Sequence, residues 1–236
     1  MPVFQLEQKN VVFVHIPKTG GSSIDDWLFD FAGCTRMLFN PQPLPDMTAT
    51  PQHICYQTIV GLLGPQMAID YSFAVVRNPF KRLESEYKYR LDLGLLAGHA
   101  NPESLFPEWV AYALDKARST PHMLDNHLRP QSYFVAPEVD IFKFEDGLNE
   151  ASQAISQRLG LTGQLLPAVP NTKISKKRHL QWNANSIERV QQFYATDFTQ
   201  FGYSAEPTGL DIRAGKQLTS LARRLYHFDR KHKKTA

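Results

Sequence analysis

The chain has 236 residues, 42% of them hydrophobic and 21% charged, a balance typical of a globular protein with a large core. Its two cysteines, Cys34 and Cys55, are too few for a disulfide framework and lack metal-ligand spacing, so we expect reduced thiols and no metal centre. No apolar run has transmembrane length, and we expect a cytoplasmic protein. The net charge is +3, but residues 213–236 carry eight Lys or Arg and one acid, whereas residues 1–212 are net negative. Because the body of the chain is not broadly basic, nucleic-acid binding is disfavoured.

Buried strands and amphipathic helices are expected to alternate along the chain. Residues 11–16 (VVFVHI) and 71–76 (YSFAVV) are runs typical of buried parallel strands, and residues 139–144 (VDIFKF) are a third strand candidate. A helix is expected after the first run, capped by Ser22 or Ser23, and further helices at 53–63, 77–94, 103–118, 147–159 and 185–197. The alternation predicts an α/β sandwich with a central parallel sheet, occupying residues 1–212.

The first strand leads into HIPKTGGSS, residues 15–23, a stretch suited to an anion. Glycines allow the backbone to approach, helix-start N–H groups point at the anion, and Lys18 adds positive charge. An ATP-hydrolysing P-loop places its lysine after the last glycine, whereas Lys18 precedes Gly20 and Gly21. An ordinary strand–helix turn with a capping serine is the alternative interpretation of this stretch.

The second strand leads into RNPFKRLESEY, residues 77–87. Arg77 stands at the carboxyl end of the strand, where open α/β sheets bind ligands, and Ser85 follows on the next helix. Asn78 is a suitable N-cap and Pro79 suits the first helical position. An arginine at such a strand end is suited to a second phosphate.

Together the two segments resemble the sulfotransferase family. HIPKTGGSS is similar to that family's 5′-phosphosulfate loop, and RNPFKRLESEY to its 3′-phosphate element, with Asn78 where an aspartate is usual. Further similarity lies in NHLRPQSYF (126–134), in FKFED (142–146) and in IERVQQFYATDFTQFGY (187–203). The resemblance is closest to the branch that holds the carbohydrate O-sulfotransferases and bacterial relatives.

The resemblance implies a P-loop-like three-layer fold and the donor 3′-phosphoadenosine 5′-phosphosulfate, with 3′-phosphoadenosine 5′-phosphate as product and no metal required. It implies that the phosphosulfate is surrounded by Lys18, Thr19, Gly20, Gly21, Ser22 and Ser23. Arg77 and Ser85 would bind the 3′-phosphate, and Lys176, in the basic loop 173–178, would add a donor contact.

Transfer to an acceptor hydroxyl requires a general base, for which histidine is well matched near neutral pH. His15 lies within the first strand run and is expected to be structural. His53, 24 residues before Arg77, occupies a place comparable to that of the catalytic histidine in related carbohydrate sulfotransferases, and is the preferred base. His127 is the second candidate or an acceptor contact, and Arg129 could meet an acidic sugar.

Residues 213–236 have leucines at helical spacing among basic side chains, and predict a basic amphipathic helix that docks on the body or touches an anionic surface. The predicted function is therefore sulfuryl transfer to a hydroxyl-bearing acceptor, favoured to be a carbohydrate. A small-molecule or nucleotide kinase and a non-catalytic nucleotide-binding module are the alternatives. The oligomeric state is not predicted by the sequence.

Overall fold

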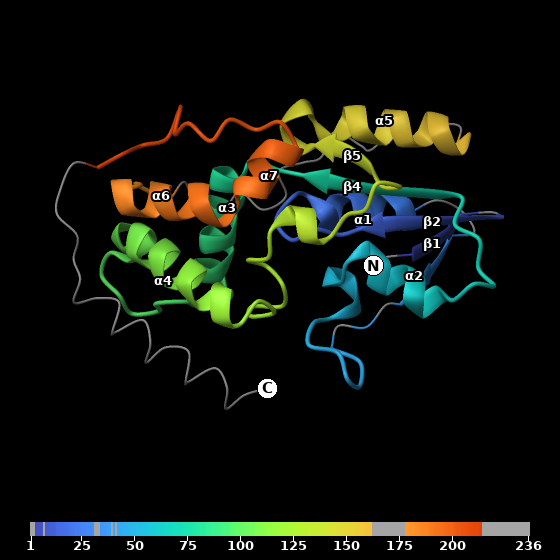
Figure 1. Cartoon of the computed structure of the whole chain (residues 1–236), viewed down its shortest axis with the longest axis horizontal. Helices are drawn as coiled ribbons and strands as arrows, with labels where there is room; N and C mark the ends of the chain where they lie inside the picture. The colour runs from blue at the N-terminus through green and yellow to red at the C-terminus, as the bar shows by residue number, and fades with distance from the viewer. Residues whose placement is uncertain are drawn as a thin grey trace. The chain divides into compact units, whose positions relative to one another are not determined.

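The computed structural model describes residues 3–6, 8–30, 34–38, 40, 42–161 and 178–213. These residues form two compact units, each assembled from two stretches of the chain. The first unit contains the sheet and draws on the described residues within 3–78 and 122–161; the second draws on residues 79–121 and 178–213, and its described elements are mainly helices (Figure 1). Among the described helices, none is both long enough and apolar enough to cross a membrane.

The first unit is built on a five-stranded sheet with the order β3-β1-β2-β4-β5. Strands β2, β4 and the edge strand β5 run parallel, whereas β1 pairs antiparallel with both β2 and β3. The strands are β1 (Val3–Leu6), β2 (Lys9–Val14), β3 (Thr35–Met37), β4 (Tyr71–Val76) and β5 (Asp140–Lys143). The predicted α/β class with a parallel centre is confirmed, and the two antiparallel strands were not predicted.

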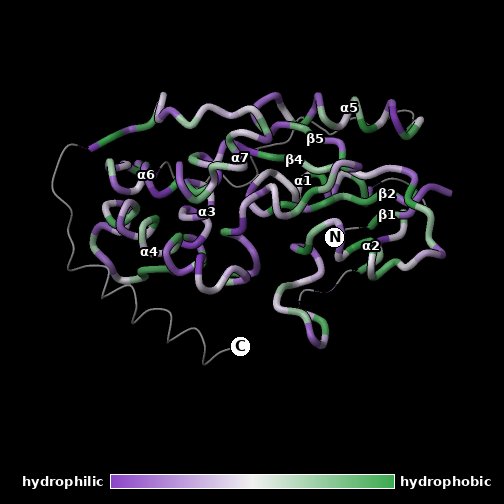
Figure 2. Tube along the Cα trace, in the orientation of Figure 1, coloured by the Kyte–Doolittle hydropathy of each residue, from purple (hydrophilic) through white to green (hydrophobic). Residues whose placement is uncertain are grey.

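Most of β2 and β4 is buried on both faces, whereas the edge strand β5 is partly exposed. On one face, side chains of β1, β2 and β4 form a single apolar cluster with α1 (Gly21–Phe29) and α5 (Leu148–Leu159). The alternate side chains, including Val12, Val14, Ala74 and Val76, are also inaccessible to solvent. Figure 2 shows hydrophobic colour over much of β2 and β4. This two-sided burial explains why these strands appear in the sequence as unbroken apolar runs.

Several predicted helix boundaries were wrong. α1 begins at Gly21 with Gly20 as its N-cap at a φ of 88°, so neither Ser22 nor Ser23 caps it; a left-handed glycine supplies the turn. The helix expected at 53–63 begins later, as α2 (Tyr56–Leu63), because Pro51–His53 forms a separate 3₁₀ turn. The helix expected at 185–197 is two helices that meet at Tyr194.

The second unit consists of helices around an aromatic core. Its helices are α3 (Pro79–Asp92), α4 (Phe106–Ser119), α6 (Ala184–Phe193) and α7 (Ala195–Gln200). Trp182 is fully buried, packs edge-on against Phe80 and Phe106, and donates its indole N–H to Glu84 at 3.0 Å. The predicted Lys176 and the tail from residue 214 onward lie outside the described residues.

Candidate active site at the carboxyl edge of the sheet

Three chain segments leave the parallel strands at the same edge of the first unit. The register pairs Val14 of β2 with Ala74 of β4, and Val76 of β4 with Lys143 of β5. The segments that follow are therefore neighbours: the turn 15–21, Arg77 with Asn78, and the 3₁₀ turn Phe144–Asp146. Ligands of open α/β sheets bind at this edge, so the predicted motifs lie where chemistry is expected.

The first segment is a tight turn with left-handed backbone at two positions. Lys18 has a φ of 69° and Gly20 a φ of 88°. The Thr19 side chain is buried and donates its hydroxyl to the carbonyl of Ile16 at 2.9 Å, which closes the turn. A non-glycine residue at positive φ costs about 1–3 kcal/mol, and such residues gather at functional sites. Lys18 is half-buried, and Ser22 is exposed on the first turn of α1.

Both glycines of this turn are required by close packing. A Cβ on Gly20 would lie 2.9 Å from Leu148 and 3.0 Å from the ring of Phe144. A Cβ on Gly21 would lie 2.2 Å from the imidazole of His15. Any side chain at Gly21 would therefore displace the His15 ring, which ties the shape of the turn to that histidine.

Arg77 joins the second motif to the first. Its Nη1 donates to the carbonyl of Lys18 at 3.2 Å, and its guanidinium lies 4.2 Å from the centre of the Phe144 ring. The Arg77 backbone is bracketed by the fully buried side chain of Gln131. The Gln131 amide accepts from the Arg77 N–H and donates to the Arg77 carbonyl, both at 2.8 Å. The two segments predicted to bind one nucleotide donor are thus in direct contact.

Gln131 was not assigned a role from the sequence, although it lies in the NHLRPQSYF segment. Its 3₁₀ turn, Gln131–Tyr133, fixes the end of β4 through both hydrogen-bonding groups of one side chain. The next backbone N–H, that of Asn78, donates to Glu145 at 2.9 Å. The direction in which the chain leaves β4 is thus fixed by contacts distant in sequence.

Three histidines form a cluster in the same unit. The His53 ring packs edge-on against His15, with ring centres 5.2 Å apart, and against His127, with ring centres 4.9 Å apart. All three side chains are buried. Burial lowers the pKa of His15 well below its ordinary value, and the neighbouring histidines and Lys18 act in the same direction. His15 is therefore neutral at neutral pH, in keeping with its predicted structural role.

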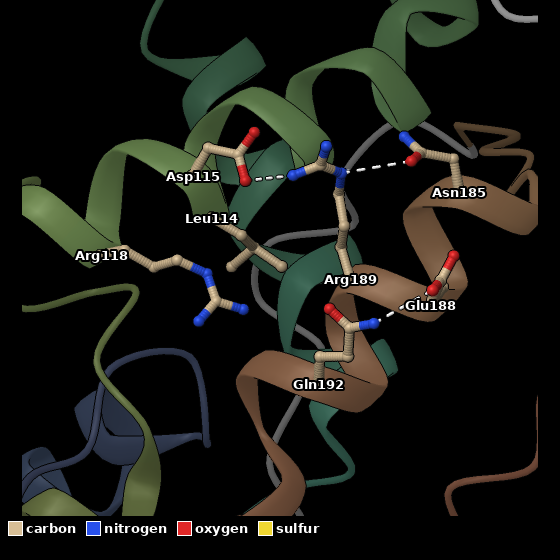
Figure 3. A pocket seen from close by; sticks show the side chains of 7 residues that line it. All are labelled: Leu114, Asp115, Arg118, Asn185, Glu188, Arg189 and Gln192. Atoms are coloured by element: carbon tan, nitrogen blue, oxygen red, sulfur yellow. Dashed lines mark hydrogen bonds and ion pairs between the residues drawn. The ribbon is translucent and has the colours of Figure 1, made fainter.

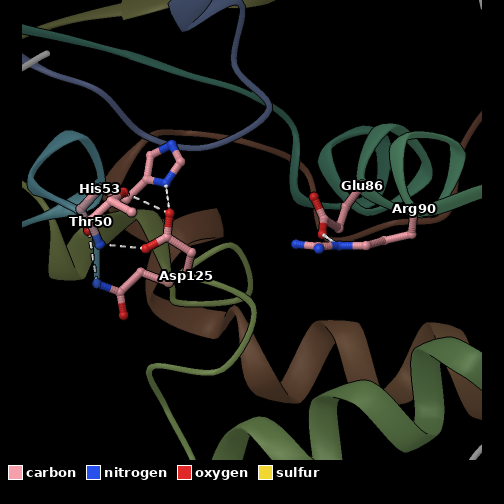
Figure 4. Close-up of polar contacts among 6 residues, drawn as sticks. Thr50, His53, Glu86, Arg90 and Asp125 are labelled. Carbon is pink, nitrogen blue, oxygen red and sulfur yellow. Dashed lines mark hydrogen bonds and ion pairs between the residues drawn. The ribbon is translucent and has the colours of Figure 1, made fainter. Parts of the chain in front are cut away.

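His53 is held by a carboxylate that sequence reasoning did not find. His53 Nδ1 lies 2.7 Å from Asp125 Oδ2. The two oxygens of Asp125 also accept from Thr50, one from its backbone N–H at 2.6 Å and the other from its hydroxyl at 2.7 Å (Figure 4). Burial raises the pKa of Asp125, but the hydrogen bonds from His53 and Thr50 outweigh it and lower the pKa to about 2. Asp125 is consequently ionised at neutral pH.

The carboxylate comes from an unusual turn. Leu124, Asp125 and Asn126 have φ values of 54°, 58° and 63°, three consecutive residues with left-handed backbone and no glycine among them. Left-handed helical conformation is disfavoured for each L-residue by roughly 1–2 kcal/mol. The surrounding contacts must offset this cost, and the bonds to Thr50 and His53 are among them.

His53, Asp125 and His127 each place a nitrogen or oxygen within 4.8 Å of the others, a spacing compatible with a metal ion. In the structure, however, the oxygens of Asp125 accept three hydrogen bonds from donors on Thr50 and His53. A cation there would have to displace these donors. The arrangement is thus better suited to orient an imidazole than to coordinate a metal.

The structure brings Lys18, Thr19, Gly20, Gly21, Ser22, Ser23 and Arg77 to one sheet edge, and gathers His15, His53 and His127 in the same unit. Ser85 lies half-buried on α3 of the second unit, so its place beside Arg77 stays a prediction, as does that of Lys176. Arg129 donates to Asn126 at 3.2 Å and lies 3.9 Å from the centre of the Tyr133 ring.

The second unit has a hollow of its own, of about 350 Å³, between α4 and α6 (Figure 3). Its charged lining is largely paired, because Arg189 bonds to both Asp115 and Asn185, and Gln192 bonds to Glu188. It contains no histidine and no cysteine. None of the residues predicted as site residues from the sequence lines this hollow.

The mixed sheet, parallel through β2, β4 and β5 and covered by helices, defines an α/β protein. The sulfotransferase family model matches residues 2–204, which include most of the chain and parts of both units. The chain therefore belongs to the sulfotransferase family. Neither the comparison with curated proteins nor the comparison with solved structures found a match.

Proposed function

We propose that the protein transfers a sulfuryl group from 3′-phosphoadenosine 5′-phosphosulfate to the hydroxyl of a carbohydrate, with His53 as the general base. The observation that carries this proposal is the contact of Arg77 with the Lys18 carbonyl, because it joins two anion-binding motifs at one sheet edge. Family membership supports sulfuryl transfer as the reaction type.

The donor would occupy the carboxyl edge of the sheet. Lys18 and the first-turn N–H groups of α1 would hold the 5′-phosphosulfate, since the positive end of a helix favours an anion. Arg77 is suited to the 3′-phosphate because a guanidinium binds phosphate oxygens in a fork. Ser85 and Lys176 would complete the donor site.

The chemistry needs a proton acceptor on one side and charge stabilisation on the other. His53 would remove the acceptor's hydroxyl proton while that oxygen forms a bond to sulfur. The bond between sulfur and the bridging oxygen breaks, and its electron pair stays on the 5′-phosphate. Lys18 would stabilise the charge that develops there, an effect worth about 10²–10³-fold in rate where comparable donors have been removed. In-line positioning supplies most of the remainder.

The acceptor is proposed to be a carbohydrate on the strength of the motif resemblance to the carbohydrate O-sulfotransferases. Arg129 adds a reason to favour an acidic sugar. Its guanidinium lies over the ring of Tyr133, a stacked and partly exposed charge two residues from His127. A carboxylate or sulfate on the acceptor would be attracted to it.

Calorimetric titration with 3′-phosphoadenosine 5′-phosphate, beside ATP with magnesium, tests the donor site. We expect the bisphosphate to bind and ATP to bind far more weakly. Arg77→Ala should weaken bisphosphate binding at least about tenfold, the loss of one charge-assisted contact. Arg158→Ala, which removes an exposed arginine of the same unit, is the matched control and should bind as wild type does. Preference for ATP, or indifference to Arg77→Ala, would contradict the proposal.

A further inference from the structure

Two residues of the turn Leu124–Asn126 are hydrogen-bonded to the segment that carries His53. Asp125 accepts from the N–H and hydroxyl of Thr50 and pairs with His53 Nδ1. Asn126 donates its amide to the backbone carbonyl of His53 at 2.8 Å, in a buried contact. One short turn therefore holds the main chain and the ring of the same histidine.

The contact with Asp125 determines which ring nitrogen of His53 carries the proton. An ionised carboxylate can only accept hydrogen bonds, and both oxygens of Asp125 already accept from Thr50, one from its N–H and one from its hydroxyl. His53 Nδ1 must therefore be the donor in the 2.7 Å contact. In the neutral ring this leaves the lone pair on Nε2, the form that a general base requires.

We propose that Asp125 is a positioning residue, which the left-handed turn Leu124–Asn126 presents to His53 so that the ring stays in the Nδ1–H form with Nε2 ready to accept a proton. The role of His53 as base rests on the proposed function. The state of its ring does not, and can be measured without turnover.

Asp125→Asn is the sharpest variant because the structure determines how the new amide is oriented. The backbone N–H of Thr50 faces Oδ1 and can only donate, so the amide oxygen must occupy that position. The amide NH₂ then occupies the position of Oδ2, 2.7 Å from His53 Nδ1. It would donate to Nδ1 and drive the ring into the opposite Nε2–H form, with little change in shape.

Nitrogen-15 NMR of the full-length protein at about pH 8, where an ordinary histidine is neutral, shows directly which ring nitrogen of His53 carries the proton. The His53 signals are assigned by their loss in His53→Gln. We expect Nδ1 to be protonated in wild type and Nε2 to be protonated in Asp125→Asn. Asp70→Asn is the control, since Asp70 is exposed in the same unit and likewise accepts a backbone N–H, that of Asn10. It should leave the His53 signals unchanged.

Turnover completes the test. We expect Asp125→Asn to lower kcat about 10²-fold or more, with the bisphosphate Kd unchanged. An unchanged ring form in Asp125→Asn would overturn the inference. A reversed ring form with wild-type kcat would also overturn it, provided that His53→Ala is inactive. An active His53→Ala would instead refute His53 as the base, so failure of the proposed function is distinguished from failure of the inference.

Discussion

The turns 15–21 and 124–126 of the first unit both place non-glycine residues at positive φ, and they differ in how the sequence encodes them. The turn 15–21 combines Lys18 with two glycines whose missing side chains make room for His15, Phe144 and Leu148. The turn 124–126 contains no glycine and is held by hydrogen bonds to residues more than 70 positions earlier in the chain. The first turn is marked in the sequence by its own lysine and glycines, whereas the second is held by tertiary contacts that the sequence does not reveal. In the proposed reaction the first would hold the anion and the second would position the base.

The largest expected effect is a loss of turnover on removal of His53, the histidine that the turn 124–126 contacts. His53→Ala should lower kcat about 10²–10⁴-fold, the usual contribution of a general base, while the bisphosphate Kd stays within about twofold. Stopped assays with labelled donor, beside calorimetry, measure both. The control is His122→Ala, which removes an exposed histidine of the same unit. If His127→Ala loses activity and His53→Ala does not, the base is His127.

Substitutions of Lys18 test the turn 15–21, because they are expected to change kcat and the free energy of unfolding in different ways. Lys18→Gly removes the charge and should lower kcat about 10²–10³-fold. It also relieves the φ of 69°, so the free energy of unfolding should rise by up to about 1 kcal/mol.

Lys18→Ala is the matched variant, since it loses the same charge but keeps the unfavourable backbone. It should be as inactive as Lys18→Gly and less stable. Equal stability of the two variants in denaturant titrations would show that Lys18 carries no backbone strain.

Two glycine substitutions sharpen the claim that the first turn is specified by close packing. Gly21→Ala places a Cβ 2.2 Å from the His15 ring and should lower the free energy of unfolding by about 1–3 kcal/mol. Gly61→Ala is the counterpart, because Gly61 lies within α2 with nothing within 4 Å of the added atom. It should stabilise the protein by about 0.5–1 kcal/mol. Urea titration of both variants decides the point, and a harmless Gly21→Ala would refute the packing argument.

The smallest expected effect concerns acid stability. The pKa of Asp125 is lowered to about 2 in the folded protein from an ordinary value of 3.8, so the unfolded chain takes up the proton first as the pH falls. The ionised side chain therefore stabilises the fold above about pH 4, by roughly 1 kcal/mol after screening, and this is lost as the pH falls toward about 2. The stability difference between wild type and Asp125→Asn should shrink over that interval. A constant difference would mean that the carboxylate charge is not involved.

The sequence predicted the elements whose signals are local. Residues 71–76 form β4 as expected, because a strand buried on both faces is apolar throughout. β3 was missed because three residues, TRM, with a partly exposed pattern, give no periodic signal. Likewise Lys18 and Arg77 could be identified beside their strands. Asp125 and Gln131 could not, because their roles arise from contacts made 54 to 75 positions away.

The central claim is that the protein transfers a sulfuryl group from the nucleotide donor. The most direct measurement follows a sulfur-35 label from the donor to the acceptor. The full-length protein is incubated with sulfur-35 3′-phosphoadenosine 5′-phosphosulfate and a panel of neutral and acidic oligosaccharides. We predict that label moves to at least one acidic member, that 3′-phosphoadenosine 5′-phosphate is released in equal amount, and that His53→Ala abolishes both. Tight donor binding with no label transferred to any member would contradict this account and favour a non-catalytic nucleotide-binding module.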